Sequence, residues 1–221
     1  MRASDGTRFR FPRWFNRAFL LLLTGLGAFP AYALGMFYFG TYPQALTVGY
    51  QPKQPVPYSH ALHVGKLGMD CRYCHIGVDK GAQATIPATE TCMACHKSIA
   101  VTRPSLDPIR NNFRTGEPIE WVRIHKVPDY AYFNHSAHVT RGVGCVECHG
   151  RIDQMEVVSQ VAPLNMGWCL DCHRNPEPHL RPKELVTLMD WQPKEDRVEL
   201  GKKLRKEYNL NPSTDCSTCH R

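Results

Sequence analysis

Residues 133–150, FNHSAHVTRGVGCVECHG, place two histidines three residues apart ahead of a Cys-x-x-Cys pair that is followed directly by a third histidine. Residues 58–77, YSHALHVGKLGMDCRYCHIG, show the same order of residues about 74 positions earlier (145 minus 71). The chain therefore carries two copies of one unit, and the question is what chemistry requires this order of histidines and cysteines.

Every cysteine of the chain belongs to a Cys-x-x-Cys pair followed by histidine. The five sites are Cys71/Cys74/His75, Cys92/Cys95/His96, Cys145/Cys148/His149, Cys169/Cys172/His173 and Cys216/Cys219/His220. This spacing is the attachment signature of haem c, in which two thiols form thioethers to the porphyrin and the adjacent histidine binds iron. Only 11 of the 221 residues are histidine, so chance does not explain a histidine at all five places.

Disulfides, zinc ribbons and a thioredoxin-like redox pair are the other readings of repeated Cys-x-x-Cys pairs. None of them requires a histidine after the second cysteine each time. The sequence therefore predicts five covalently bound haem c groups, and it leaves no cysteine free to act as a catalytic thiol.

Six histidines lie outside the attachment motifs, and a haem iron used only for electron transfer needs a sixth, strong-field ligand. Histidines three apart on a helical turn share one face but diverge, so each His-x-x-His pair can reach two irons. We therefore expect His60, His63, His135 and His138 to be distal ligands. The fifth distal ligand is left to His125 or His179, with the thioethers of Met69, Met93, Met155 and Met166 as alternatives.

Residues 18–40, AFLLLLTGLGAFPAYALGMFYFG, are uncharged over a length that suits one membrane-spanning helix. By the positive-inside rule, the arginines before this segment place the N-terminus in the cytoplasm and the remainder outside. A cleaved signal peptide is the alternative, but the apolar run exceeds the usual signal core. We expect an uncleaved single-pass anchor in a bacterial cytoplasmic membrane, with the haem domain on the periplasmic side. The arginines are Arg2, Arg8, Arg10, Arg13 and Arg17.

The repeat and the anchor predict the organisation of the chain. The expected segments are a cytoplasmic N-terminus (1–17), a transmembrane anchor (18–40), a linker (41–57), a first two-haem module (58–100), a connector (101–132), a second two-haem module (133–180) and a C-terminal segment with the fifth haem (181–221). Four prolines in the connector predict an extended or looped path. Residues 194–208 predict a charged surface helix.

The 181 residues after residue 40 leave about 36 residues for each haem, too few for a conventional side-chain core. We expect a mostly α and irregular fold with a haem-packed core and one N-terminal transmembrane helix. The formal net charge is +7, but no basic stripe interleaved with aromatic residues indicates nucleic-acid binding.

The chain resembles two groups of known proteins. An aromatic residue, then His-x-x-His, then Cys-x-x-Cys-His is similar to the class III multihaem cytochromes c. Together with the anchor and the five sites, HKVPDYAYFNHSAH (125–138), CHGRIDQMEVV (148–158), MGWCLDCHRNPEPHLRP (166–182) and CSTCHR (216–221) resemble the pentahaem subunit family of alternative complex III, a bacterial quinol oxidoreductase. This resemblance spans nearly the full length, and the region around Cys169 is its most specific part.

The resemblance implies an electron-transfer subunit with no catalytic site of its own. Its partners would be integral-membrane quinol-binding subunits, an iron-sulphur subunit and a monohaem cytochrome c or terminal oxidase. A self-standing quinol dehydrogenase of the nitrite-reductase-partner type competes with it, although its first haem follows the anchor almost immediately. A pentahaem nitrite reductase would need one open iron, typically marked by lysine in place of a motif histidine, and here all five sites have histidine.

Overall fold

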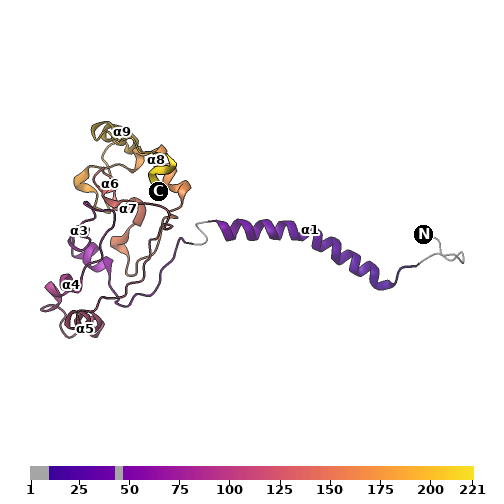
Figure 1. Cartoon of the computed structure of the whole chain (residues 1–221), viewed down its shortest axis with the longest axis horizontal. Helices are drawn as coiled ribbons and strands as arrows, with labels where there is room; N and C mark the ends of the chain where they lie inside the picture. Colours follow the sequence, from indigo (N-terminus) through magenta and orange to yellow (C-terminus); the bar gives the residue numbers. More distant parts are fainter. Residues whose placement is uncertain (1–9, 43–46) are drawn as a thin grey trace. The chain divides into compact units, whose positions relative to one another are not determined.

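The computed structural model describes residues 10–42 and 47–221, which belong to two compact units, Met1–Leu46 and Thr47–Arg221 (Figure 1). The predicted cytoplasmic segment 1–17 and the predicted linker 41–57 fall partly outside the described residues. Arg2 and Arg8 also lie outside them. The two units are described separately below.

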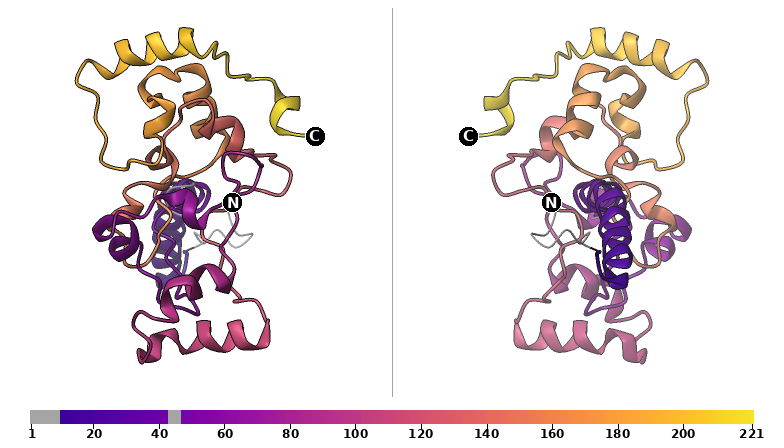
Figure 2. Two further views of the ribbon diagram at one scale, coloured as in Figure 1. Left: turned by 90° about the vertical axis from the view of Figure 1, so that its left-hand side faces the viewer. Right: turned by 90° about the vertical axis from the view of Figure 1, so that its right-hand side faces the viewer.

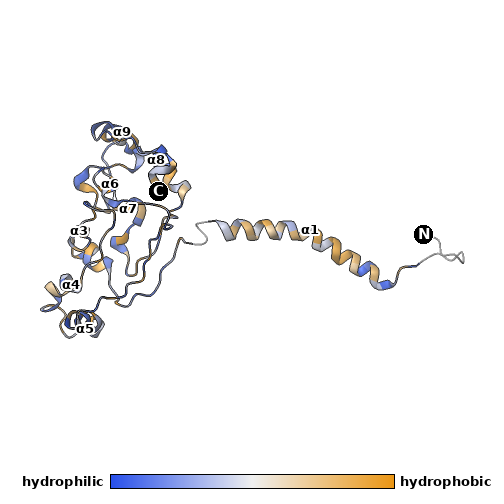
Figure 3. Cartoon of the chain, in the orientation of Figure 1, coloured by the Kyte–Doolittle hydropathy of each residue, from blue (hydrophilic) through white to orange (hydrophobic). Residues whose placement is uncertain are grey.

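The first unit contains one long helix, α1 (Arg13–Thr41), which includes the whole predicted anchor 18–40. The helix is long and apolar enough to cross a membrane, and none of its residues is buried within the protein. Figure 3 shows apolar residues along much of α1. Pro30 lies inside the helix, where the missing N–H and the ring disturb the hydrogen bonds of the preceding turn. Figure 1 shows α1 bending part-way along its length.

The second unit consists of short helices joined by irregular segments. They are η1 (Ala61–Lys66, a π-helix), α3 (Cys71–Cys74), α4 (Thr89–His96), η2 (Pro104–Leu106), α5 (Asp107–Thr115), α6 (His135–Val139), α7 (Cys145–His149), η3 (Ile152–Gln154), α8 (Met166–Arg174), η4 (Glu177–His179), η5 (Lys183–Leu185), α9 (Arg197–Glu207) and α10 (Cys216–Cys219). Residues 10–42 and 47–221 contain no strand, and the bridge between Val143 and Leu180 is isolated. The predicted fold class, mostly α and irregular with one N-terminal apolar helix, is confirmed.

Within this unit, α4 and α5 lie at one end, and α8 and α9 lie at the other (Figure 1). Figure 2 shows the same separation from two further sides, with the yellow α9 opposite the pink α5. The C-terminal α10 lies toward the α8 end. After α3 the chain therefore passes to the end with α4 and α5, and it then returns through α6 and α7 to the end with α8 and α9.

The side-chain core of this unit is small. The apolar side chains that are buried among the described residues are Val56, Val78, Ile109, Ala162, Leu180, Val186, Met189 and Leu204. A unit of this length normally buries a larger apolar core when it folds alone. The small core is therefore consistent with the expectation that haem supplies much of the buried apolar surface.

The connector is more ordered than its prolines suggest, and the prediction of an extended or looped path was wrong for residues 104–115. Pro108 stands in the first turn of α5, where proline is tolerated because its missing N–H would have no partner in the helix. Ile109 is buried, and Gly116 ends the helix at φ 77°. The apolar contact of Ile109 stabilises this helix despite the local proline signals.

The predicted charged helix near the C-terminus is present as α9. Asp196 caps it, because its side chain accepts hydrogen bonds from the backbone N–H groups of Val198 and Glu199, both at 3.0 Å. Gly201 lets the helix pack closely on η4, since a Cβ at this position would lie 1.9 Å from the Glu177 carbonyl oxygen. Arg205 donates to the Glu177 carboxylate at 2.5 Å. These contacts hold η4, and with it His179, against α9.

Candidate haem-binding sites

The five attachment motifs lie in five helices, α3, α4, α7, α8 and α10. In a helix, residues three apart lie on the same face, so each pair of thiols can reach one porphyrin. None of the ten cysteines forms a disulfide in the structure. Among the described residues, no group of three or more histidine, cysteine, aspartate or glutamate side chains is arranged to hold a metal ion directly. This arrangement does not match a zinc ribbon, whose four ligands converge on one ion.

Most of the motif and His-x-x-His imidazoles are oriented by the backbone. In seven of them Nδ1 lies within hydrogen-bond distance of a backbone carbonyl, so Nδ1 must carry the proton. The neutral ring then keeps the Nε2 lone pair free for a metal, which is the usual arrangement of a histidine ligand. The seven, with their carbonyl partners, are His63 with Ser59, His75 with Thr85, His96 with Ile99, His135 with Ala82, His138 with Asn134, His173 with Ser213 and His220 with Tyr130.

Three pairs of histidine rings have the separation expected for two ligands of one iron. With metal–nitrogen bonds of about 2 Å, two imidazoles on opposite sides of an ion have ring centres about 6 Å apart. The observed pairs are His63 with His96 at 6.2 Å, His138 with His173 at 6.1 Å and His135 with His149 at 6.5 Å. In each pair a predicted distal histidine faces a predicted proximal one. The residues therefore fit the haem groups that the motifs predict.

An aromatic ring packs against both histidines of each His-x-x-His element. Tyr58 lies 4.8 Å from His60 at 86° and 4.4 Å from His63 at 23°. Phe133 lies 4.7 Å from His135 at 83° and 4.6 Å from His138 at 30°. The sequence repeat is thus also a repeat of side-chain geometry. In both elements the ring of the first histidine stands edge-on to the aromatic ring, and the ring of the second lies at a small angle to it.

Burial keeps several of these imidazoles neutral, which is the form that binds iron. It lowers the pKa of His60 to about 4, with further contributions from His75 and His63. It lowers the pKa of His149 to about 3, and His125 and His135 are the next largest contributors. Burial also lowers the pKa of His138. The pKa of His60 therefore responds to the charge of His75, the motif histidine of the first attachment site.

His125 lies at the second module's first attachment site. Its ring is 4.4 Å from that of His149, and its Nε2 is buried without a hydrogen-bond partner. Burial lowers its pKa, followed by the charge of His135. Two predicted distal histidines, His125 and His135, therefore lie near one proximal histidine. The Nδ1 of His60 is also buried without a partner.

His179 lies elsewhere, in η4, and its Nδ1 is 2.8 Å from the Glu147 carboxylate. A carboxylate on one ring nitrogen orients the other for metal binding. The His220 ring packs on Tyr130 at 5.8 Å, and no histidine ring within the described part of the chain contacts it. The structure therefore brings neither His125 nor His179 into ring contact with the fifth site.

As a group, the four methionines are less well placed than the histidines to act as distal ligands. Met166 is exposed, and Met155 has its sulphur 4.0 Å from the Ser159 hydroxyl. Met69 and Met93 are half-buried.

Sequence reasoning missed a buried ionic cluster around Glu147, which lies inside the third attachment motif. Arg181, with a side chain only 1% exposed, donates to Glu147 at 3.2 Å, and Arg197 lies 3.5 Å from the same carboxylate. Burial lowers the pKa of Arg181 and opposes the lowering of the Glu147 pKa by His179 and the arginines. Arg181 also lies over the Trp191 ring at 5.1 Å. No spacing rule connects these positions, so the sequence carried little signal for the cluster.

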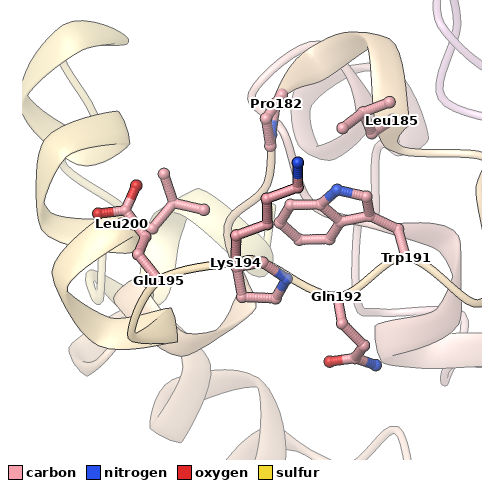
Figure 4. A pocket seen from close by; sticks show the side chains of 8 residues that line it. Pro182, Leu185, Trp191, Gln192, Lys194, Glu195 and Leu200 are labelled. Atoms are coloured by element: carbon pink, nitrogen blue, oxygen red, sulfur yellow. The ribbon is translucent and has the colours of Figure 1, made fainter.

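A nearby cavity of about 460 Å³ is not one of the predicted haem sites. It is lined by Pro182, Leu185, Trp191, Gln192, Pro193, Lys194, Glu195 and Leu200 (Figure 4). None of these residues is a cysteine or a histidine, so the cavity has no means of attaching a porphyrin.

The thiols of different motifs lie close enough to affect one another. The interaction between the Cys71 and Cys145 thiols raises the pKa of Cys71 and lowers that of Cys145. Burial and then Cys74 raise the pKa of Cys92, and burial and then Cys219 raise that of Cys169. Burial and then the charge of Cys172 raise the pKa of Cys148 to about 12.

Comparison with known proteins agrees with this geometry. Residues 131–221 match the family described as cytochrome c7 and related cytochrome c. This region is cytochrome c7-like. It contains three of the five motifs, so it is a multihaem region, and the family implies covalently bound haem c.

The chain is also similar to the multihaem cytochrome c subunit of menaquinone reductase from Nitratidesulfovibrio vulgaris Hildenborough. The two are 32% identical over 100 residues, which are 45% of this chain and 47% of the relative. The match thus spans about half the length of that relative.

Proposed function

We propose that the protein is a membrane-anchored pentahaem cytochrome c that relays electrons within a quinol-oxidising respiratory complex of the alternative complex III type. Electrons would pass to a monohaem cytochrome c or a terminal oxidase. The observation that carries the proposal is the pairing of His63 with His96 and of His138 with His173 at about 6 Å. Such pairs occupy both axial positions of an iron, which suits electron transfer and leaves no open position for a substrate.

The residues of the five motifs would attach five haem c groups, and each motif histidine would be the proximal ligand. His60, His63, His135 and His138 would be the distal ligands of the first four sites. His125 and His179 are retained as candidates for the remaining position. Each bound haem supplies a one-electron centre, and the protein orients and covers it.

Membrane attachment would come from α1, which is long and apolar enough to span a bilayer. Arg10 precedes α1, and Arg13 and Arg17 lie in its first two turns. The positive-inside rule would therefore put this end in the cytoplasm and the haem unit on the periplasmic side. Integral-membrane quinol-binding subunits and an iron-sulphur subunit would then be its partners. The named complex of the similar protein supports a quinone-linked role in a membrane complex.

Two alternatives differ in the source or direction of the electrons. The similar protein belongs to a menaquinone reductase, which favours transfer toward menaquinone as a second candidate. A self-standing quinol dehydrogenase would hold its own quinol site. The structure supports this reading less, because α1 ends at Thr41 and the first attachment site begins only at Cys71.

The first test is the intact mass of the purified full-length protein, for which we expect five covalently attached haems. A lower number would overturn the pentahaem assignment. The second test is anaerobic mixing of this protein in liposomes with menaquinol, followed through the haem absorption bands. We expect reduction by dithionite but not by menaquinol, whereas rapid reduction by menaquinol would favour the dehydrogenase. A third test mixes the reduced complete complex with menaquinone. Electron transfer toward menaquinone, the second candidate, requires that the haems become oxidised in this experiment.

A further inference from the structure

The two modules bind each other through the same hydrogen bond made twice. The backbone N–H of Ala61, in the first His-x-x-His element, donates to the Met155 carbonyl at 3.0 Å. The N–H of Ser136, the equivalent residue of the second module, donates to the Gly81 carbonyl at 3.0 Å. Gly81 and Met155 are themselves equivalent, because each lies six residues after its motif histidine, His75 or His149. Each module therefore donates one of these two hydrogen bonds and accepts the other, at equivalent residues.

The first attachment sites of both modules meet at this junction. The carbonyl of Val186 accepts a hydrogen bond from the backbone N–H of Cys145 at 3.0 Å, and the carbonyl of Thr187 lies 4.0 Å from the Cys71 sulphur. Val186 and Thr187 are consecutive and both are buried. Two adjacent residues therefore hold the first cysteines of two motifs that are 74 positions apart (145 minus 71).

Within each module, one helical turn joins the two attachment sites. In α6, His135 faces His149 and His138 faces His173. In η1, His63 faces His96, and α3 with the first attachment motif follows η1 closely in the chain. Each His-x-x-His turn therefore lies between the first and the second site of its own module.

The fifth site is joined to the second site of the second module through Ser213. The Nδ1 of His173 donates to the Ser213 carbonyl at 2.6 Å. The hydroxyl of Ser213 lies 2.9 Å from that of Thr218, which stands inside the last motif. The fifth site is also bound to the segment before α6, because the N–H of Tyr132 donates to the Cys219 carbonyl at 2.8 Å.

We infer that the five attachment sites form one unbranched row in the spatial order Cys92, Cys71, Cys145, Cys169, Cys216, which differs from their order in the chain. This inference rests on the proposed function, since it requires a haem at every site.

The ends of the row are its points of electron exchange. Of the ten cysteines only Cys95 and Cys216 are exposed, and they belong to the two outermost sites. Figure 1 places α4, which carries Cys95, at the end of the unit opposite to α8. Electrons that cross the whole row would therefore enter at one of these two sites and leave at the other, with the junction at Cys71 and Cys145 in between.

The row can be tested by marking single sites with a methionine ligand in the full-length protein. A methionine ligand raises the potential of its haem, so His63→Met allows the haem at Cys92 to be reduced alone, and His138→Met does the same at Cys169. Reduction of a low-spin ferric haem removes its magnetic coupling to its neighbours. In electron paramagnetic resonance we expect the His63→Met mark to alter the signal of one other haem and the His138→Met mark to alter two.

Two or more altered haems for His63→Met, or only one for His138→Met, would overturn the row. The intact mass of the unmodified protein tests the proposed function separately. Fewer than five haems would contradict the proposed function, whereas five haems with the wrong number of altered signals would contradict only the row. If either variant is not fully loaded, anomalous scattering from iron in crystals of the unmodified protein gives the order of the five ions directly. Any nearest-neighbour order other than the one above would contradict the inference.

Discussion

The two modules place the same ligands with different local structures. Both pack one aromatic ring against two histidines at nearly the same angles, but the first does so from the π-helix η1 and the second from the α-helix α6. Asn134 caps α6 by accepting from the Ser136 N–H at 3.0 Å, whereas Ser59 accepts from the Leu62 N–H at 2.9 Å at the start of η1. Ligand geometry is thus retained while the supporting backbone differs.

The attachment helices differ more strongly, and the cause is burial. Asp70 caps α3 and pairs with Arg72 in a half-exposed position. The equivalent residue of the second module is Gly144, where a Cβ would lie 2.3 Å from the Arg181 side chain. Arg181 lies against α7 and pairs with Glu147, so there is no space for an aspartate. The second module is therefore held by a buried ionic cluster and the first by an exposed pair.

The largest effect is expected from the buried cluster. Arg181→Met removes one partner of Glu147, whose side chain is only 14% exposed, and should lower the free energy of unfolding by about 3 kcal/mol. Denaturation of the full-length haem-loaded protein measures the loss. Arg72→Met is the matched control in the first module and should cost less than about 1 kcal/mol, because that pair is exposed. Equal losses would remove the distinction between the modules.

The next effect concerns the residue after each first motif histidine. Gly150 has φ 64° and ψ −162°, a region that is almost restricted to glycine, and a Cβ there would lie 2.7 Å from Val161. Gly150→Ala should therefore destabilise the protein by on the order of 1–3 kcal/mol. The equivalent residue of the first module, Ile76, is exposed, so Ile76→Ala should change the denaturation midpoint little. A neutral Gly150→Ala would contradict the strained turn.

A smaller effect, of the same size in both modules, is expected at the aromatic ring that contacts each His-x-x-His pair. Phe133→Leu and Tyr58→Leu each remove an aromatic ring that contacts two histidines, and each should cost about 0.5–1.5 kcal/mol beyond the lost area. The thermal midpoint of each variant gives the comparison, with the low-spin haem spectrum as a check on ligation. A loss confined to one variant would show that the repeated geometry does not have a repeated role.

The smallest effect is the pH dependence that the exposed pair of Asp70 and Arg72 gives to the first module. The Arg72 hydrogen bond lowers the pKa of Asp70 from 3.8 to about 2, so the ionised carboxylate stabilises the folded state. This contribution is complete above about pH 4 and is lost as the pH falls toward 2. The stability difference between the natural protein and Asp70→Asn should therefore shrink between pH 6 and pH 2.5. A difference independent of pH would contradict the role of the charge.

The sequence by itself determined the five Cys-x-x-Cys-His motifs, the His-x-x-His elements and the apolar helix, because each depends on spacing within a few residues. The helical fold class followed from the same motifs, and α9 from its polar pattern. The connector shows the limit of such local reasoning. Its prolines predict a looped path, but Pro104 begins η2, Pro108 lies in the first turn of α5, and Ile109 of the same helix is buried.

Only the tertiary structure decided which histidine faces which site and how the modules meet. The pairing of His63 with His96, the exchange of hydrogen bonds at Gly81 and Met155, and the junction at Val186 and Thr187 all join residues far apart in the chain. The sequence also does not reveal why Gly144 and Asp70 differ at one equivalent position. The reason is physical. Local spacing fixes which side chains lie on one face of a helical turn, whereas the residues that they contact depend on which distant segment packs against that turn.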